Sequence, residues 1–212
     1  MRPSTGSRRL ALSAFALVVV VLIAVAAVAI SRSGDEQATA SKVDLSAVSG
    51  QGAKTAPPWL LPTDVSARVK AAGLNLGAMG MAEHYHVHLD ILIDGKAVSV
   101  PADVGVDPSD GAMSALHSHS NDGIVHIEAA TKGQAFTLGQ FFTQWDVALS
   151  GNQIGSLVAG DGKSLTAFVN GKKITSNPAM IRLAERQQIT LVFGPTEAQV
   201  KVPDSFDFGN DL

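Results

Sequence analysis

Alternating apolar and polar residues run from Glu83 to Asp94 and predict a β-strand. Successive side chains of a strand point to opposite faces, so this pattern gives one apolar and one polar face. The apolar face is formed by Tyr85, Val87, Leu89, Ile91 and Ile93, and the other face by His84, His86, His88, Asp90, Leu92 and Asp94. The pair Asp94-Gly95 is typical of a hairpin tip, and residues 97–100 can form the returning strand.

Further strands are predicted downstream. Residues 116–120 and 124–129 form two short extended segments around a turn at Asn121-Asp122-Gly123. Residues 164–174 form a hairpin with Asn170-Gly171 at its tip, and residues 189–193 form a late strand.

Helical patterns are few and short. Residues 62–64 start one helix, which carries Val65, Val69 and Leu74 and is expected to stop at Gly73. Thr137 caps a second helix, whose apolar side is expected in the core and consists of Leu138, Phe141, Phe142 and Trp145. Asn177-Pro178 opens a turn or helix that ends near Leu183. The sequence therefore predicts an α+β domain, mainly antiparallel β, with one or two short helices.

A long apolar segment precedes this domain. Residues 10–30 contain no charge and only one polar residue, Ser13, and a helix of that length spans a bilayer. Residues 1–9 carry Arg2, Arg8 and Arg9, so the positive-inside rule places the N-terminus in the cytoplasm. We expect a single-pass anchor in the cell membrane and an extracytoplasmic C-terminal domain. The alternative is a signal peptide, cleaved after residues 27–29, and a secreted protein.

The remaining chain is divided by composition. Residues 31–62 are rich in Ser, Ala, Gly, Lys and Asp and contain Pro57-Pro58, which is typical of a flexible tether. Residues 63–77 form the short helical segment, residues 78–205 the folded domain and residues 206–212 a tail. A tether of this length would let the domain reach a neighbouring membrane protein, which the sequence does not identify.

Composition excludes several kinds of site. The chain has no cysteine, so it has no disulfides, thiolate zinc sites, iron–sulfur clusters or copper centres of the His₂Cys type. Residues 78–212 hold eight Lys and Arg against fifteen Asp and Glu, a balance of −7. Such an acidic domain is unsuited to nucleic acid, because phosphate binding needs a basic surface.

All six histidines of the chain lie within one region of the folded domain. They are His84, His86, His88, His117, His119 and His126. Residues at i and i+2 of a strand lie about 6.5–7 Å apart, so two such imidazoles can converge on one ion, whereas His84 and His88 are too far apart to do so. We expect a metal site that takes two of the first three histidines and one or two of the last three.

The nature of the ligands limits the metal and the chemistry. Histidines with or without a carboxylate suit zinc, copper(II) or nickel, and two histidines with one carboxylate would allow iron(II). Glu128 follows His126 on the same strand face and is a candidate ligand, general acid/base or hydrogen-bond partner. Asp90 has similar options on the face of His88, and Glu83 and Asp122 lie nearby in sequence.

Three functions fit these residues. The first is a membrane-anchored carrier, buffer or assembly factor for copper or zinc. The second is a metal-dependent enzyme with histidine ligands and Glu128 as its general acid/base. The third is a structural or interaction domain whose histidines respond to pH.

Four stretches carry a family resemblance: HYHVHLDILIDGKAVSVPADVGVD, LHSHSNDGIVHIE, FTLGQFFTQWDV and LTAFVNGKKIT, in that order. They resemble a poorly characterised family of exported or membrane-anchored bacterial proteins, over roughly residues 84–193. The resemblance implies that His86, His88, His117, His119, His126 and Glu128 act as one signature, and it implies no reaction. Ser120 stands where the family tends to have an aspartate after the second histidine.

Overall fold

The computed structural model describes residues 51–77, 79–196 and 200–209. The predicted cytoplasmic segment (1–9), the predicted anchor (10–30) and most of the predicted tether lie outside the described residues. Within the described part of the chain, no helix combines the length and the apolar character needed to cross a bilayer.

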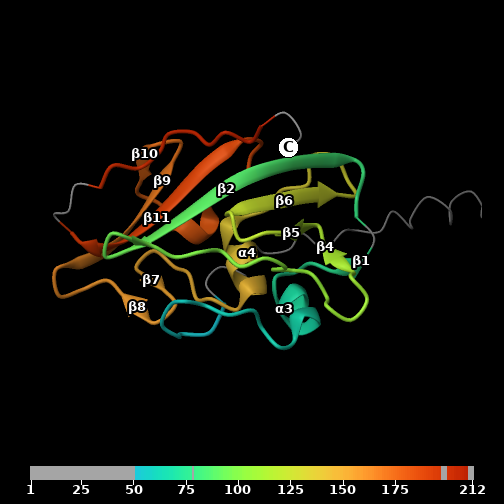
Figure 1. Cartoon of the computed structure of the whole chain (residues 1–212), viewed down its shortest axis with the longest axis horizontal. Coiled ribbons are helices and arrows are strands. Elements are labelled where there is room, and N and C mark those ends of the chain that lie inside the picture. Colours follow the sequence, from blue (N-terminus) through green and yellow to red (C-terminus); the bar gives the residue numbers. More distant parts are fainter. Residues whose placement is uncertain (1–50, 78, 197–199, 210–212) are drawn as a thin grey trace, which may run out of the picture. The chain divides into compact units, whose positions relative to one another are not determined.

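A seven-stranded sheet is the main element of the fold (Figure 1), in the strand order β10-β9-β11-β2-β6-β5, with β3 paired to β2. Strand β11 runs parallel to β2, and the other pairs in this sheet are antiparallel. The seven strands are β2 (Glu83–Ile93), β3 (Lys96–Ala97), β5 (Leu116–His117), β6 (Ile124–Ala129), β9 (Lys163–Val169), β10 (Lys172–Ile174) and β11 (Gln187–Pro195).

Two small two-stranded sheets and three short helical elements complete the domain. The small sheets pair β1 (Leu76–Gly77) with β4 (Met113–Ser114), and β7 (Gln153–Ile154) with β8 (Leu157–Val158). The helical elements are α3 (Val65–Ala71), α4 (Leu138–Trp145) and the 3₁₀ turn η1 (Pro178–Met180). The predicted α+β class, mostly antiparallel β with two short α-helices, is confirmed.

The parallel pairing of β11 is the part of the sheet that the sequence did not predict. All residues from Gln188 to Gly194 are buried, and β11 is an interior strand between β9 and β2. A strand buried on both faces shows a continuous apolar run rather than alternation, which is how residues 189–193 read. The hairpins at Asp94-Gly95 and Asn170-Gly171 are confirmed.

Helix α4 packs into the hydrophobic core of the domain. Thr137 and Gln140 form a capping box at its N-terminus, which fixes where the helix starts. Phe141, Phe142 and Trp145 are fully buried, as predicted. On strand β2 the alternate positions Val87, Leu89 and Ile91 join the same core, so the histidine positions of β2 lie on the opposite face.

The core also takes in residues on either side of the predicted domain. Trp59, in the last part of the predicted tether, is 4% exposed and packs edge-on against Trp145, with ring centroids 5.7 Å apart. Val65 and Val69 of the short helical segment are buried in the same cluster. In the predicted tail, Phe208 is 3% exposed. Among the described residues, the buried core therefore extends from Trp59 to Phe208.

Candidate metal centre

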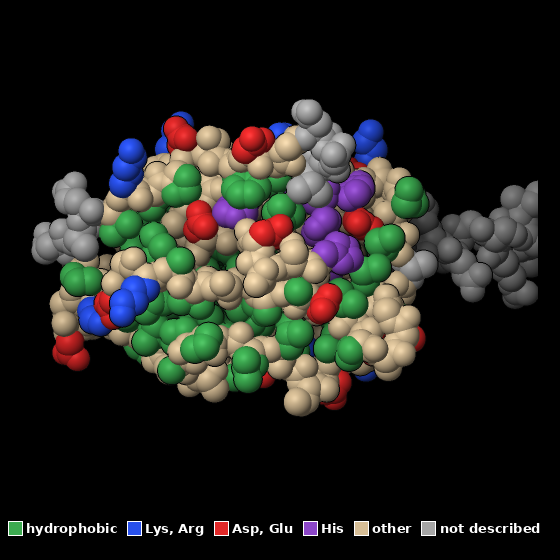
Figure 2. Space-filling model, in the orientation of Figure 1, with side chains coloured by type: hydrophobic (Ala, Val, Ile, Leu, Met, Phe, Trp, Pro, Cys, Tyr) green, Lys and Arg blue, Asp and Glu red, His purple; other side chains and the backbone are tan. Residues whose placement is uncertain are grey.

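Strands β2, β6 and β5 lie side by side and bring together four histidines, with His119 two residues beyond the end of β5. His86 lies directly opposite His126, and His126 lies directly opposite His117, so these three form a row across the three strands. His84 lies opposite Glu128 in the same register. Figure 2 shows most of the visible histidine side chains gathered in one patch, with Asp and Glu side chains beside it.

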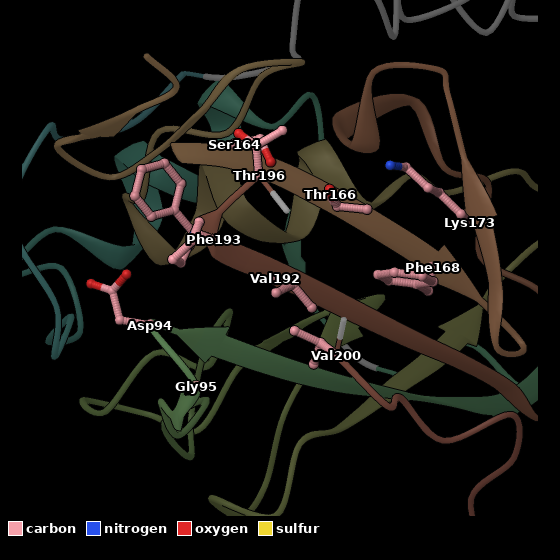
Figure 3. Close-up of a pocket in the computed structure, with 12 residues that line it drawn as sticks. Asp94, Gly95, Ser164, Thr166, Phe168, Lys173, Val192, Phe193, Thr196 and Val200 are labelled. Atoms are coloured by element: carbon pink, nitrogen blue, oxygen red, sulfur yellow. The ribbon is translucent and has the colours of Figure 1, made fainter. Parts of the chain in front are cut away.

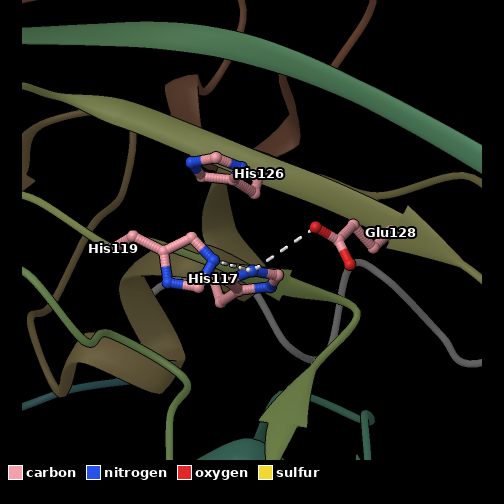
Figure 4. A group of neighbouring side chains, drawn as sticks. All are labelled: His117, His119, His126 and Glu128. Carbon is pink, nitrogen blue, oxygen red and sulfur yellow. Dashed lines mark hydrogen bonds and ion pairs between the residues drawn. The ribbon is translucent and has the colours of Figure 1, made fainter. Parts of the chain in front are cut away.

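The first group of possible ligands consists of His117, His119, His126 and Glu128 (Figure 4). Each offers one ligand atom, and these atoms all lie within 4.8 Å of one another. The Nε2 atoms of His117 and His119 are 3.0 Å apart, and Glu128 Oε1 lies 3.9 Å from His117 Nε2. His117 and Glu128 are buried, whereas His119 is exposed.

The second group consists of His84, His86 and His126, again with ligand atoms within 4.8 Å of one another. His84 Nε2 and His86 Nε2 are 3.2 Å apart, and His86 Nε2 lies 3.0 Å from His126 Nδ1. Glu128 Oε1 lies 3.5 Å from His84 Nε2. The His84 side chain is 56% exposed, so solvent reaches this group as well.

These separations suit coordination of a metal ion. Two nitrogens bound to one tetrahedral zinc ion lie about 3.3 Å apart, given Zn–N bonds of about 2.0–2.1 Å. The three nitrogen pairs, at 3.0–3.2 Å, are close to this value. Without an ion, an N–H of one imidazole donates to the nitrogen of the next at the same distance. The cluster could therefore hold a metal ion with little rearrangement.

His117 is held in the tautomer that metal binding requires. Its Nδ1–H donates to the Ser114 carbonyl oxygen at 2.8 Å, so in the neutral ring the lone pair lies on Nε2. That Nε2 is the atom that faces His119 and Glu128. Hydrogen bonds of this kind orient histidine ligands in metalloproteins.

Burial keeps the central imidazoles neutral. It lowers the pKa of His117 from 6.5 to about 4, an effect that the Ser114 carbonyl opposes and neighbouring histidines reinforce. Burial, followed by the neighbouring His86 and His117, lowers the pKa of His126 to about 3. The pKa of His86 is lowered for similar reasons, with His84 as the first neighbour. Neutral imidazoles have free lone pairs, so these side chains are ready to bind a metal at neutral pH.

His88 lies outside both groups, although it shares their face of β2. Its Nδ1–H donates to Gln188 Oε1 at 2.8 Å, and its Nε2 faces the Asp122 carbonyl oxygen at 2.9 Å. Its ring also stacks on Phe206, with centroids 3.7 Å apart. Because these partners occupy both ring nitrogens and Phe206 covers the ring, neither nitrogen of His88 is available to an ion in the two groups.

The orientation of Gln188 supports this arrangement. Its Nε2 donates to Asp90 Oδ2 at 3.0 Å and to the Ile189 carbonyl oxygen at 3.2 Å. A flipped amide would bring its oxygen against these acceptors, so Oε1 must face His88. Asp90 thus belongs to the His88 network, where its Oδ2 lies 3.9 Å from His88 Nδ1. Asp122 belongs there through its carbonyl oxygen, and its carboxylate accepts from Ile124 N at 2.9 Å.

Sequence reasoning missed three residues around the histidines: Ser114, Gln188 and Phe206. Ser114 acts through its backbone carbonyl, so no side-chain pattern could reveal it. Gln188 and Phe206 lie about 100 residues away along the chain from His88, and only the pairing of β11 with β2 brings Gln188 beside it. Glu83, considered above, is partly buried at the start of β2 and is not in either group.

A separate hollow of about 280 Å³ lies at the other end of the sheet (Figure 3). It is lined by residues of β9, β10 and β11 and of the turn after β2, including Asp94, Thr166 and Lys173. Asp94 is eight residues beyond His86, which corresponds to about 26 Å along a strand. This hollow is therefore not part of the metal centre.

Comparisons with known proteins reveal no relative of this chain. No family model matches the chain, and neither a curated protein nor a solved structure shows significant similarity to it.

Proposed function

We propose that this protein binds a transition-metal ion through His117, His119, His126 and Glu128. The observation that carries the proposal is the convergence of three imidazoles and one carboxylate, with ligand atoms within 4.8 Å of one another. Nitrogen ligands with a single carboxylate and no thiolate suit copper(II) or zinc, and leave nickel and iron(II) as alternatives.

The exposure of the group supports a role in holding and releasing metal. His119 is exposed while His117 and Glu128 are buried. An ion bound here would be held by the buried side chains and would remain accessible from solvent on the side of His119. We propose a carrier, buffer or assembly factor for copper or zinc. In this proposal Glu128 acts as a ligand, because its carboxylate lies among the imidazole nitrogens.

The lowered pKa values of His117 and His126 do not favour these two residues as a pH-responsive switch. The pKa values of His117 and His126, at about 4 and about 3, lie below the range from pH 5 to 8 in which such switches work. The metal-dependent enzyme remains the second candidate, since the exposed side of the group would admit a water or substrate as a further ligand.

We further propose that the domain lies outside the cell membrane, anchored by residues 10–30, with the cleaved and secreted form as the alternative. On the sequence resemblance over residues 84–193, we also propose that the chain belongs to the His-rich exported family described above. Protease treatment of intact cells tests the placement: the domain should be digested while a cytoplasmic marker survives. Protection of the domain would contradict it.

Elemental analysis tests the metal proposal. The full-length chain, purified without a polyhistidine tag, is loaded with copper or zinc, desalted and analysed for metal per chain. We expect at least one ion to be retained by the wild type, and less by the His119→Ala variant, whose replaced side chain is exposed. The proposal is wrong if the wild type retains no transition metal at micromolar concentrations.

A further inference from the structure

We propose that the protein binds two metal ions at once, the second held by His84 and His86, with His126 bridging the two ions. This inference rests on the proposed function, since it adds a second ion to the first. The two groups of ligand atoms share only His126, and each has close nitrogen contacts of its own.

The order of the strands places His126 in the middle. It lies on β6, between His86 on β2 and His117 on β5, and it is directly opposite both. Neighbouring strands are about 4.8 Å apart, so His86 and His117 are separated by about 10 Å at the backbone. A single ion beside His86 is therefore distant from His119. An ion beside His117 is likewise distant from His84. Two positions, one on each side of His126, use all five imidazoles.

The ring of His126 has a nitrogen for each position. Its Nδ1 faces His86 Nε2 at 3.0 Å, which assigns Nδ1 to the second group. Nε2 is then the atom that would bind the ion of the first group. An imidazole that binds through both nitrogens has lost its remaining N–H proton, which passes to solvent when the second ion binds, and the ring becomes an imidazolate.

Glu128 is placed to act on both sides. Its Oε1 lies 3.5 Å from His84 Nε2, in the second group, and 3.9 Å from His117 Nε2, in the first. Its negative charge and that of the imidazolate offset part of the repulsion between two cations. Because two divalent ions carry more charge than these groups neutralise, we expect the second ion to bind more weakly than the first.

Copper(II) titration of the full-length, untagged protein tests the bridge, followed by both metal content and electron paramagnetic resonance. Two copper(II) ions joined by one imidazolate couple their unpaired electrons and weaken the resonance signal. We expect the signal to grow up to one ion per chain and to fall as the second ion binds. Saturation at two ions per chain with a weakened signal supports the bridge.

Two matched variants separate the sites, because His84 and His119 are both exposed and each belongs to one group only. His84→Ala should bind one copper ion per chain with an undiminished signal at saturation. His119→Ala should weaken the first site and retain binding through His84 and His86. Thermal unfolding of the metal-free variants checks that both remain folded.

The outcomes distinguish this inference from the proposed function. Saturation of the wild type at one ion overturns the second site and leaves the first intact. Two ions with a full, uncoupled signal, or two ions retained by His84→Ala, also overturn the bridge. Absence of bound metal in the wild type overturns the proposed function itself.

Discussion

The polar face of strand β2 carries three histidines that belong to two different environments. His84 and His86 point toward His126, and nitrogen faces nitrogen at 3.0–3.2 Å. His88, two residues further along, is enclosed by Gln188, the Asp122 carbonyl oxygen and Phe206. The difference teaches that a candidate ligand is distinguished from an enclosed histidine by what faces its ring nitrogens, not by its place in an alternating pattern.

The strands on either side of β2 cause this difference. At His84 and His86 the neighbour is β6, which presents another histidine and Glu128. At His88 the parallel neighbour β11 presents Gln188 in direct register. An amide oxygen accepts the imidazole N–H and orients the ring, whereas a facing imidazole offers a lone pair of its own. The comparison yields four predictions.

The largest expected effect is the loss of metal from His126→Ala. This variant removes the ligand that both groups share, so metal affinity should fall more than about 100-fold, beyond the effect of losing an outer hydrogen-bond partner. Competition with a chelator of known affinity measures it. Unchanged affinity in His126→Ala would show that the row of histidines across β2, β6 and β5 is not the site.

Acid should destabilise the metal-free protein through the cluster. Unfolded His117 takes up a proton near pH 6.5, whereas the folded residue stays neutral down to about pH 4. The contribution of His117 to the free energy of unfolding is therefore fully present above pH 6.5. It falls by about 3 kcal/mol as the pH is lowered toward 4. Urea unfolding at a series of pH values measures the slope.

The control for the acid prediction is His117→Gln, which removes the titrating ring. Its unfolding free energy should depend less on pH between about 6.5 and 5, a range that lies above the titration of most carboxylates. A wild-type protein whose stability is constant or increases as the pH falls through this range would contradict the prediction.

His88→Gln should act on stability and not on metal. Glutamine lacks the ring that donates Nδ1–H to Gln188 Oε1 and stacks on Phe206, so this buried acceptor loses its donor, at a cost of about 1–3 kcal/mol. Thermal unfolding measures the loss, and elemental analysis should find the metal content of the wild type. A drop in metal content with unchanged stability would place His88 among the ligands.

The smallest effect is expected from Thr137→Ala, which removes the cap of helix α4 on the apolar side of the sheet. Loss of a helix cap costs about 0.5–2 kcal/mol. Metal binding should be unchanged, so this variant provides a destabilised reference against which the His88 variant is judged. Reduced metal affinity in Thr137→Ala would mean that affinity follows overall stability and not the ligands.

Most of the local structure could be predicted from the sequence. The alternation from Glu83 to Asp94 gave strand β2, the Asp94-Gly95 and Asn170-Gly171 pairs gave the hairpin tips, and Thr137 gave the start of α4. These features depend on neighbours within a few residues, for which turn and cap preferences hold. The parallel pairing of β11 with β2 could not be predicted, because strand partners about 100 residues apart leave no local pattern.

The limits of the folded domain show a similar contrast. Residues around Pro57-Pro58 have the composition of a tether, yet Trp59 is buried against Trp145. Phe206 and Phe208 fall in the predicted tail, yet they pack beside His88 and Arg186. A few aromatic side chains hold such segments on the core, because each buries a large apolar area that average composition does not register.

The sequence by itself determined that six histidines and Glu128 occupy a short region, and that alternate residues share a strand face. Alternation is a property of the extended chain, so these conclusions needed no knowledge of the fold. Only the tertiary structure decided that His126 stands between His86 and His117, and that His88 is enclosed by Gln188 and Phe206. The physical reason is that strand order and register set what lies across from each ring, and both depend on packing of distant segments.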